Sequence, residues 1–226
     1  RVKDSMEDIL QAVRDVGIIS SAGGGVGVDF SMLRPKDDFI KTTEGTSSGP
    51  VSFMKLFDAT AEVIKQGGKR RSALLGLMRV DHPDIEEFIK CKEAEGKFSN
   101  FNISVAITDE FMDAVQGNGD FNLINPAGGK VSKTVKAKDL WKLICESAHK
   151  NGEPGLVFID TMNKNNPAAQ FGEIECVNPC FSGDMRLLTT DGYKTFKELD
   201  GKEICIIVPS GSIQRAKVFK TGIKKV

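Results

Sequence analysis

The sequence lacks several features that would each point to a particular class of protein. Its 31 lysines and arginines balance 31 aspartates and glutamates, so net charge gives no reason to expect binding to nucleic acid or to a membrane. It contains no run of about 18 apolar residues, so we expect no membrane-spanning helix. The two histidines do not pair with cysteines at zinc spacing, which argues against a structural zinc site. The chain begins without methionine or an apolar signal region, so we expect an internal piece of a longer protein.

Cysteine is also sparse. The five cysteines are scattered and odd in number, a pattern typical of reduced thiols rather than of a disulfide framework. Cys91 and Cys145 fall within helical patterns, and Cys176 falls within a strand-like run, so we expect all three to be structural. The cysteine usage therefore favours a cytoplasmic protein.

The first part of the chain has the pattern of an α/β protein. Apolar residues at helical spacing predict a helix over 4–17, with Gly17 as its C-terminal stop. The nearly continuous apolar run at 72–80 predicts a strand buried on both faces, and the alternating run at 101–107 predicts another. Strands that alternate with helices indicate an α/β fold with a largely parallel sheet.

The pattern changes near Cys180. After this residue the sequence shows short β-type runs, turn dipeptides such as Asp191-Gly192, and no long helical pattern. We therefore expect two domains, 1–179 and 180–226, the second of them β-rich. No exposed linker rich in proline, glycine or serine separates them, although tandem domains usually have one.

Two glycine-rich stretches could hold phosphate. The cluster at 23–27 lacks the dinucleotide-binding fingerprint, because Phe30 stands where the last glycine is required. In KQGGKRRSALLG, by contrast, Lys65, Lys69 and Arg70 surround a glycine pair at a predicted helix-to-strand turn. Such a turn can bind nucleotide phosphates, or it can simply place cations beside a helix C-terminus. The residues alone leave both interpretations open.

Read in order, a series of segments resembles the catalytic chain of a ribonucleotide reductase, most closely the adenosylcobalamin-dependent, class II branch. Together they span residues 1–180 almost without a gap. The segments are DSMEDI, SAGGGVGVDFSMLRP, TSSGPVSFMKLFD, QGGKRRSALLGLMRVDHPDIEEFI, FNISVAITDEFM, GEPGLVFIDTMNKNNP and IECVNPC.

This resemblance implies a fold, a reaction and partners. The fold would be part of a ten-stranded α/β barrel whose finger loop carries a thiyl-forming cysteine. The thiyl radical takes the 3′ hydrogen of a ribonucleotide substrate, and adenosylcobalamin is the implied cofactor. A deoxynucleotide or ATP effector, a thioredoxin-type reductant and a homodimer are implied as partners, and no nucleic acid or membrane.

The resemblance also assigns site residues, though no metal ligands. Those assigned to substrate are Phe30, Ser31 and Asn178. Those assigned to the effector are Asp4, Ser5, Met6, Arg34, Lys65, Gln66, Lys69 and Arg70. The sequence departs from the family pattern after Asn178-Pro179-Cys180, because position 182 is serine where the family has glutamate. The two cysteines that supply reducing electrons in the family also have no counterpart here.

From Cys180 onward the sequence resembles the N-terminal splicing block of an intein. The block consists of a cysteine, a Gly-Asp pair three residues later, a β run, an Asp-Gly turn and the amphipathic FKEL. The resemblance implies that the Cys180 thiol attacks the carbonyl of Pro179 and forms a thioester. The later Thr-x-x-His block and the terminal asparagine of inteins are not in the sequence, so we expect this chain alone neither to splice nor to reduce nucleotides.

Two alternatives remain. In the first, the reductase is uninterrupted, Cys180 is its own thiyl cysteine, and the tail has diverged. In the second, the chain is a non-catalytic nucleotide-binding module.

Overall fold

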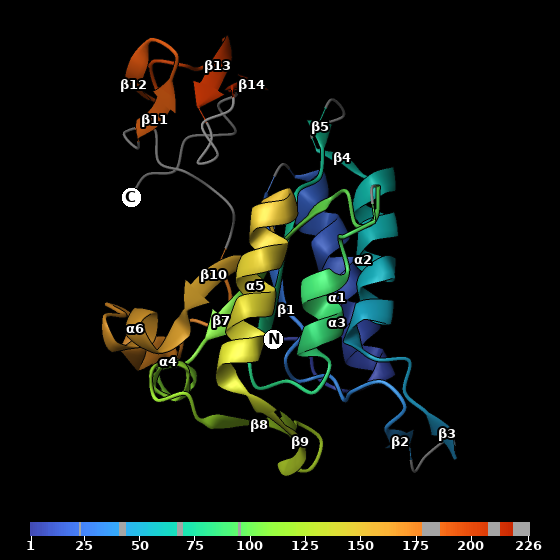
Figure 1. Cartoon of the computed structure of the whole chain (residues 1–226). Coiled ribbons are helices and arrows are strands. Elements are labelled where there is room, and N and C mark those ends of the chain that lie inside the picture. The colour runs from blue at the N-terminus through green and yellow to red at the C-terminus, as the bar shows by residue number, and fades with distance from the viewer. Residues whose placement is uncertain are drawn as a thin grey trace. The chain divides into compact units, whose positions relative to one another are not determined.

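A computed structural model describes residues 1–22, 24–40, 44–66, 70–94, 96–177, 186–207 and 213–218 (Figure 1). Its contacts divide the chain into two compact units, Arg1–Pro179 and Cys180–Val226, and each is described by itself. In the described part of the chain, no helix combines the length and apolar character that a bilayer crossing requires.

The first unit is built on a parallel sheet. Its strands lie in the order β1-β6-β7-β10 and all neighbours run parallel. The prediction of an α/β fold with a parallel sheet is therefore confirmed, and the described strands form an open sheet rather than a closed barrel. The strand bounds are β1 (Val26–Asp29), β6 (Leu74–Arg79), β7 (Phe101–Ile107) and β10 (Gly155–Phe158).

Helices connect these strands. Because crossovers between parallel strands are right-handed, a strand order that advances in one direction places the connecting helices on one face. Figure 1 shows α2, α3 and α5 along the same side of the sheet. The helices are α1 (Met6–Ser21), α2 (Pro50–Val63), α3 (Ile85–Lys90), α4 (Asp109–Gln116), α5 (Ala137–Asn151) and α6 (Ile159–Lys164), with a 3₁₀ turn η1 (Ala169–Phe171).

The predicted stop of the first helix at Gly17 is wrong. Helix α1 begins after Ser5, whose hydroxyl caps the Asp8 N–H at 3.1 Å, but it continues to Ser21. Gly17 is buried against α2, and a Cβ there would lie 3.0 Å from Ile64 Cδ1. This glycine therefore allows two helices to approach closely, a tertiary use that helix-end rules do not contain.

The two faces of the sheet are covered unequally. Alternate residues such as Met78, Ile103 and Val105 enter a large core shared with α1, α2, α3, α4 and α5. The intervening residues Leu77 and Ala106 enter a second, small cluster on the opposite face. That cluster is completed by α6 and by the segment 174–177, defined here as the docked segment.

Three antiparallel hairpins leave the sheet. They are β2 (Phe39–Ile40) with β3 (Gly45–Thr46), β4 (Lys65–Gln66) with β5 (Arg70–Arg71), and β8 (Asp120–Asn125) with β9 (Lys130–Lys136). Of β4 and β5 the structure describes only the backbone. The β8–β9 hairpin is anchored to the end of β6 by a 2.7 Å hydrogen bond from the Ile124 N–H to the Asp81 carbonyl.

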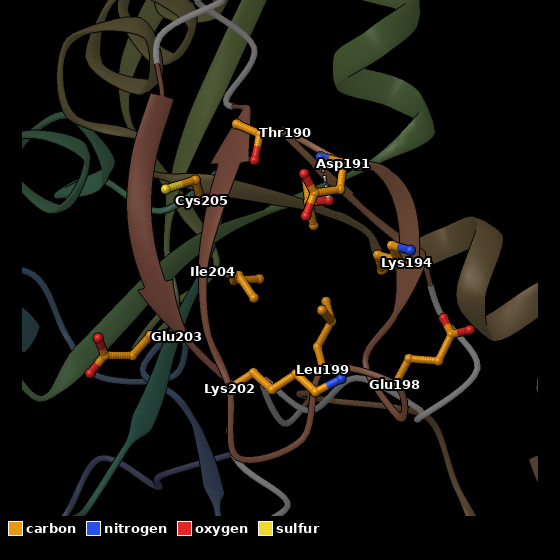
Figure 2. Close-up of a pocket in the computed structure, with 10 residues that line it drawn as sticks. Thr190, Asp191, Lys194, Glu198, Leu199, Lys202, Glu203, Ile204 and Cys205 are labelled. Carbon is orange, nitrogen blue, oxygen red and sulfur yellow. Dashed lines mark hydrogen bonds between the residues drawn. The ribbon is translucent and has the colours of Figure 1, made fainter.

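The second unit is an antiparallel sheet in its described residues, with strand order β12-β11-β13-β14. The predicted turn at Asp191-Gly192 joins β11 and β12, and Gly192 takes the positive φ of 92° that such turns require. This unit contains a hollow of about 600 Å³. Figure 2 shows Leu199 and Ile204 pointing into it and charged side chains such as Asp191, Lys194 and Glu198 around it. The strands are β11 (Arg186–Thr189), β12 (Gly192–Thr195), β13 (Glu203–Ile207) and β14 (Ile213–Lys217).

Candidate functional site

The carboxyl ends of β1 and β6 bring polar side chains together at one edge of the sheet. The buried Asp29 carboxylate accepts hydrogen bonds from Arg1 Nε at 3.0 Å and from the Ser31 N–H at 2.9 Å, and it also bonds the Ser31 hydroxyl. The Ser31 Oγ in turn accepts the Arg79 N–H at 2.8 Å. The Ser31 hydroxyl proton is therefore used within the protein, so in this arrangement the hydroxyl serves a ligand as an acceptor.

Phe30 lies beside Ser31 but faces the other way. Its side chain is fully buried in the helix-side core, where its ring packs edge-on against Phe57 with centroids 5.3 Å apart. A ligand at this edge would meet only the backbone of Phe30.

Arg79 balances the charge at the same edge. Its guanidinium binds both oxygens of the Asp81 carboxylate, at 2.6 Å and 3.0 Å for the shortest contact to each. The hydrogen bond to Asp81 raises the pKa of Arg79, and the negative charges of Asp81, Asp160 and Asp29 add to this. Asp81 is thus the direct partner of Arg79, and the carboxylates of Asp29 and Asp160 act on it through their charge.

His82 fixes the loop that contains Ser31, a role that no local sequence pattern predicts. Its ring is buried; Nδ1 accepts the Asp84 N–H at 3.0 Å, and Nε2 lies 2.8 Å from the Leu33 carbonyl. Since Nδ1 is an acceptor, Nε2 carries the proton and donates it to Leu33. Burial lowers the pKa of His82, which favours this neutral form. A buried histidine bonded to a carbonyl 49 residues away leaves no signal in a local pattern.

Part of the predicted effector site is assembled in the structure. Asp4 accepts two hydrogen bonds from Arg34, at 3.1 Å from its N–H and 2.7 Å from Nε. Ser5 caps α1, and Met6 is exposed beside it. The start of α1 and the loop after β1 therefore meet, and Arg34 lies three residues from Ser31.

The other predicted effector residues lie elsewhere. Lys65, Gln66 and Arg70 belong to the β4–β5 hairpin, which follows the end of α2 and contacts α1 (Figure 1). Ile64, just before this hairpin, packs against Gly17 near the end of α1, whereas Asp4 precedes its start. A helix of 16 residues is about 24 Å long, so one chain does not bring the two groups into one site. Lys69 lies outside the described residues.

The docked segment lies on the sparsely covered face of the sheet. A Cβ on Gly27 would lie 2.1 Å from the Val177 carbonyl oxygen and 2.7 Å from Cys176 Sγ, so β1 and this segment are in direct contact. Asn178, Pro179 and Cys180 follow Val177 in the chain and lie outside the described residues. The structure thus places the residues that lead into the predicted finger loop, and the loop itself stays a prediction.

The cysteines of the first unit differ in environment, which predicts their reactivity. Burial raises the pKa of Cys91 and of Cys176 to about 12, so both thiols are protonated at neutral pH, whereas Cys145 is exposed. With iodoacetamide at pH 8, we expect Cys91 and Cys176 to react roughly a hundredfold more slowly than Cys145. Peptide mass spectrometry over time measures these rates, and equal labelling of Cys176 and Cys145 would contradict the docked segment. Urea-unfolded chain is the control.

A metal site is not formed by the described residues, since nowhere among them do three or more histidine, cysteine, aspartate or glutamate side chains gather suitably.

Most of this chain is similar in sequence to proteins of one known family. Residues 1–182 match the family model described as ribonucleotide reductase, barrel domain. The chain is 49% identical over 188 residues to a vitamin B12-dependent ribonucleoside-diphosphate reductase of Thermoplasma acidophilum, covering 83% of this chain and 24% of that protein. A protein of the same name from Mycobacterium tuberculosis H37Rv is 44% identical, covering 83% and 26%.

Similarity to a viral protein extends further. The ribonucleoside-diphosphate reductase large subunit of Invertebrate iridescent virus 6 is 33% identical over an alignment of 238 positions, which covers 99% of this chain and 24% of the viral one. Its match therefore includes most of the second unit. The chain spans about a quarter of the length of these relatives.

Proposed function

The chain belongs to the ribonucleotide reductase family, and from this premise we propose that the complete protein reduces ribonucleotides to deoxyribonucleotides for DNA synthesis. Because the chain covers only about a quarter of its relatives, the activity is proposed for the longer protein rather than for these 226 residues. On this hypothesis the open sheet is part of a ten-stranded barrel that acts in the cytoplasm.

The observation that carries this proposal is the docked segment on the sparsely covered face of the sheet. Val177 and Cys176 lie against Gly27, and the carboxylate of Asp29 is close enough to Cys176 to raise its pKa further. In an α/β barrel the helices that connect the strands cover the outside, so the opposite face of the sheet is the interior, and residues at the carboxyl ends of strands form the site. Asn178, the next residue, would then start the finger loop at that interior.

In the proposed reaction, a cysteine thiyl radical at the position after Pro179 takes the 3′ hydrogen atom of the ribose. Asn178 would hold a ribose hydroxyl by hydrogen bonding, while the Ser31 hydroxyl and the Phe30 backbone would contact the substrate. Two further thiols and a thioredoxin-type reductant would supply the electrons. Cys91 and Cys176 do not suit that role, since both are half-buried thiols with a raised pKa.

The relatives are named vitamin B12-dependent, and we propose adenosylcobalamin as the cofactor of the complete protein. The residues that the structure describes do not fit this group. Both ring nitrogens of His82 are engaged within the protein, and His149 is exposed at the end of α5.

For the effector we propose a site shared between two copies of the chain. Helices α1 and α2 expose the apolar side chains Met6, Leu10, Leu56 and Val63, at 57, 53, 41 and 80% of their surface, which supports a contact with a second copy. If two such helix pairs meet antiparallel, the start of α1 in one copy lies beside the β4–β5 hairpin of the other. A deoxynucleotide or ATP could then contact both groups of predicted effector residues, which are about 24 Å apart within one chain.

For the second unit we propose an intein fragment that begins at Cys180. An uninterrupted barrel would continue with further strands and helices, whereas the unit that begins at Cys180 is an antiparallel sheet in its described residues. The similarity to the viral large subunit across 99% of the chain supports a unit that recurs in another reductase gene. In a complete gene, we expect Cys-Gly-Glu directly after the intein.

The test of the reductase proposal is an assay of the complete protein. With adenosylcobalamin and a dithiol, we expect deoxynucleotides to form from ribonucleoside di- or triphosphates, measured by chromatography of the products. Omission of the cofactor is the control. Nucleotide binding without any turnover under these conditions would instead support the non-catalytic binding module.

A further inference from the structure

Asn163 in α6 makes an unusual set of contacts with the docked segment. Its side-chain oxygen accepts the Ile174 N–H at 2.7 Å, and its side-chain nitrogen lies 3.1 Å from the Ile174 carbonyl oxygen. The same nitrogen also lies 3.1 Å from the Ile159 carbonyl at the start of α6. One amide therefore pairs both backbone groups of Ile174, as a neighbouring strand would, while a third bond ties the amide to its own helix.

The two hydrogen bonds between Asn163 and Ile174, called the clamp below, hold the start of the docked segment. Ile174 opens the docked segment, which ends at Val177 against Gly27 of β1. Among the described residues no strand pairs with this segment, so its backbone is held by side chains. A second asparagine supports the approach to it, since Asn166 Nδ2 donates to the Gly172 carbonyl at 3.0 Å. The clamp thus lies four residues before Asn178.

We propose that Asn163 is a positioning residue that sets the register of the docked segment on the sheet. This inference rests on the proposed function, because that function makes the stretch after Val177 the reactive one. Asn163 itself would touch neither substrate nor cofactor. Its role is to hold the backbone by two complementary hydrogen bonds, which requires an acceptor and a donor in one planar group.

Alkylation of Cys176 tests this proposal, because the thiol is partly buried while the docked segment lies on β1. In the 226-residue chain with Asn163→Ala, we expect Cys176 to be alkylated about tenfold faster than in the parent chain, the change that about 1.4 kcal/mol of lost local stability produces. Cys91, half-buried at the end of α3, should keep its rate and so report that the first unit remains folded.

Two further variants separate hydrogen bonding from packing and from helix stability. Asn163→Asp keeps the size of the side chain but replaces the donor with an acceptor, so we expect it to free Cys176 as much as alanine does. Asn165→Ala is the matched control, because Asn165 lies just after the same helix and its amide bonds only the Thr161 carbonyl, at 2.8 Å. Labelling of Cys176 there should be unchanged.

In the complete enzyme, the Asn163 variants should lower kcat/KM for the nucleotide, because Asn178, a predicted substrate contact, directly follows the docked segment in the chain. Unchanged Cys176 labelling in Asn163→Ala, or an Asp variant that labels like the parent chain, would overturn the proposal. Either result concerns only the clamp, whereas a parent enzyme without reductase activity would overturn the proposed function and leave the labelling test intact.

Discussion

Replacement of Gly27 with alanine is expected to displace the docked segment and to remove most of the reductase activity of the complete protein. The added Cβ would lie 2.1 Å from the Val177 carbonyl oxygen and 2.7 Å from Cys176 Sγ. The first of these is a backbone atom, so no side-chain rotation relieves the contact. We expect a loss of about 1–3 kcal/mol in the free energy of unfolding, as for other overpacked sites. Because reacting groups must be placed closely, turnover should fall about a hundredfold.

Gly128→Ala is the control for this experiment. Gly128 has no atom within 4 Å of an added Cβ and does not adopt a positive φ, so alanine should be tolerated there. Thermal unfolding, product assay and Cys176 labelling measure the three effects on the same samples. Normal activity and normal Cys176 protection in Gly27→Ala would show that the segment does not lie on β1.

Replacement of Cys180 with alanine is expected to abolish splicing of the complete precursor. The proposed first step moves the Pro179 acyl group from nitrogen to the Cys180 sulfur, and alanine has no nucleophile for this transfer. The tertiary amide and ring of Pro179 crowd the reacting carbonyl, so we expect a slow first step even in the parent protein. Intact mass spectrometry of the precursor and its products over time provides the measurement.

Cys205→Ala is the matched control, since Cys205 lies on β13 of the same unit and is half-buried. It should splice at the parent rate. Spliced product from the Cys180 variant at that rate would show that another residue initiates the reaction. A chain that is never processed, but loses reductase activity with Cys180→Ala, would instead favour the uninterrupted reductase with Cys180 as its thiyl cysteine.

The sequence by itself determined the parallel α/β fold and the family. Alternating strands and helices depend on local apolar spacing, which the strands at 74–79 and 101–107 display directly. The family could be inferred because its segments recur in order along 180 residues, and comparison with known proteins confirmed it. The turn at Asp191-Gly192 could also be predicted from the sequence, since its conformation depends on the glycine within it.

Only the tertiary structure decided which of these residues meet. It placed Gly17 between two helices, put the Phe30 ring into the core, and separated the predicted effector residues to opposite ends of α1. It also joined His82 to Leu33 and Asn163 to Ile174. Each of these facts depends on a partner from another element, and a contact between elements leaves no periodic signal in the chain. Local chemistry is therefore visible in the sequence, whereas the positioning of the site arises from packing.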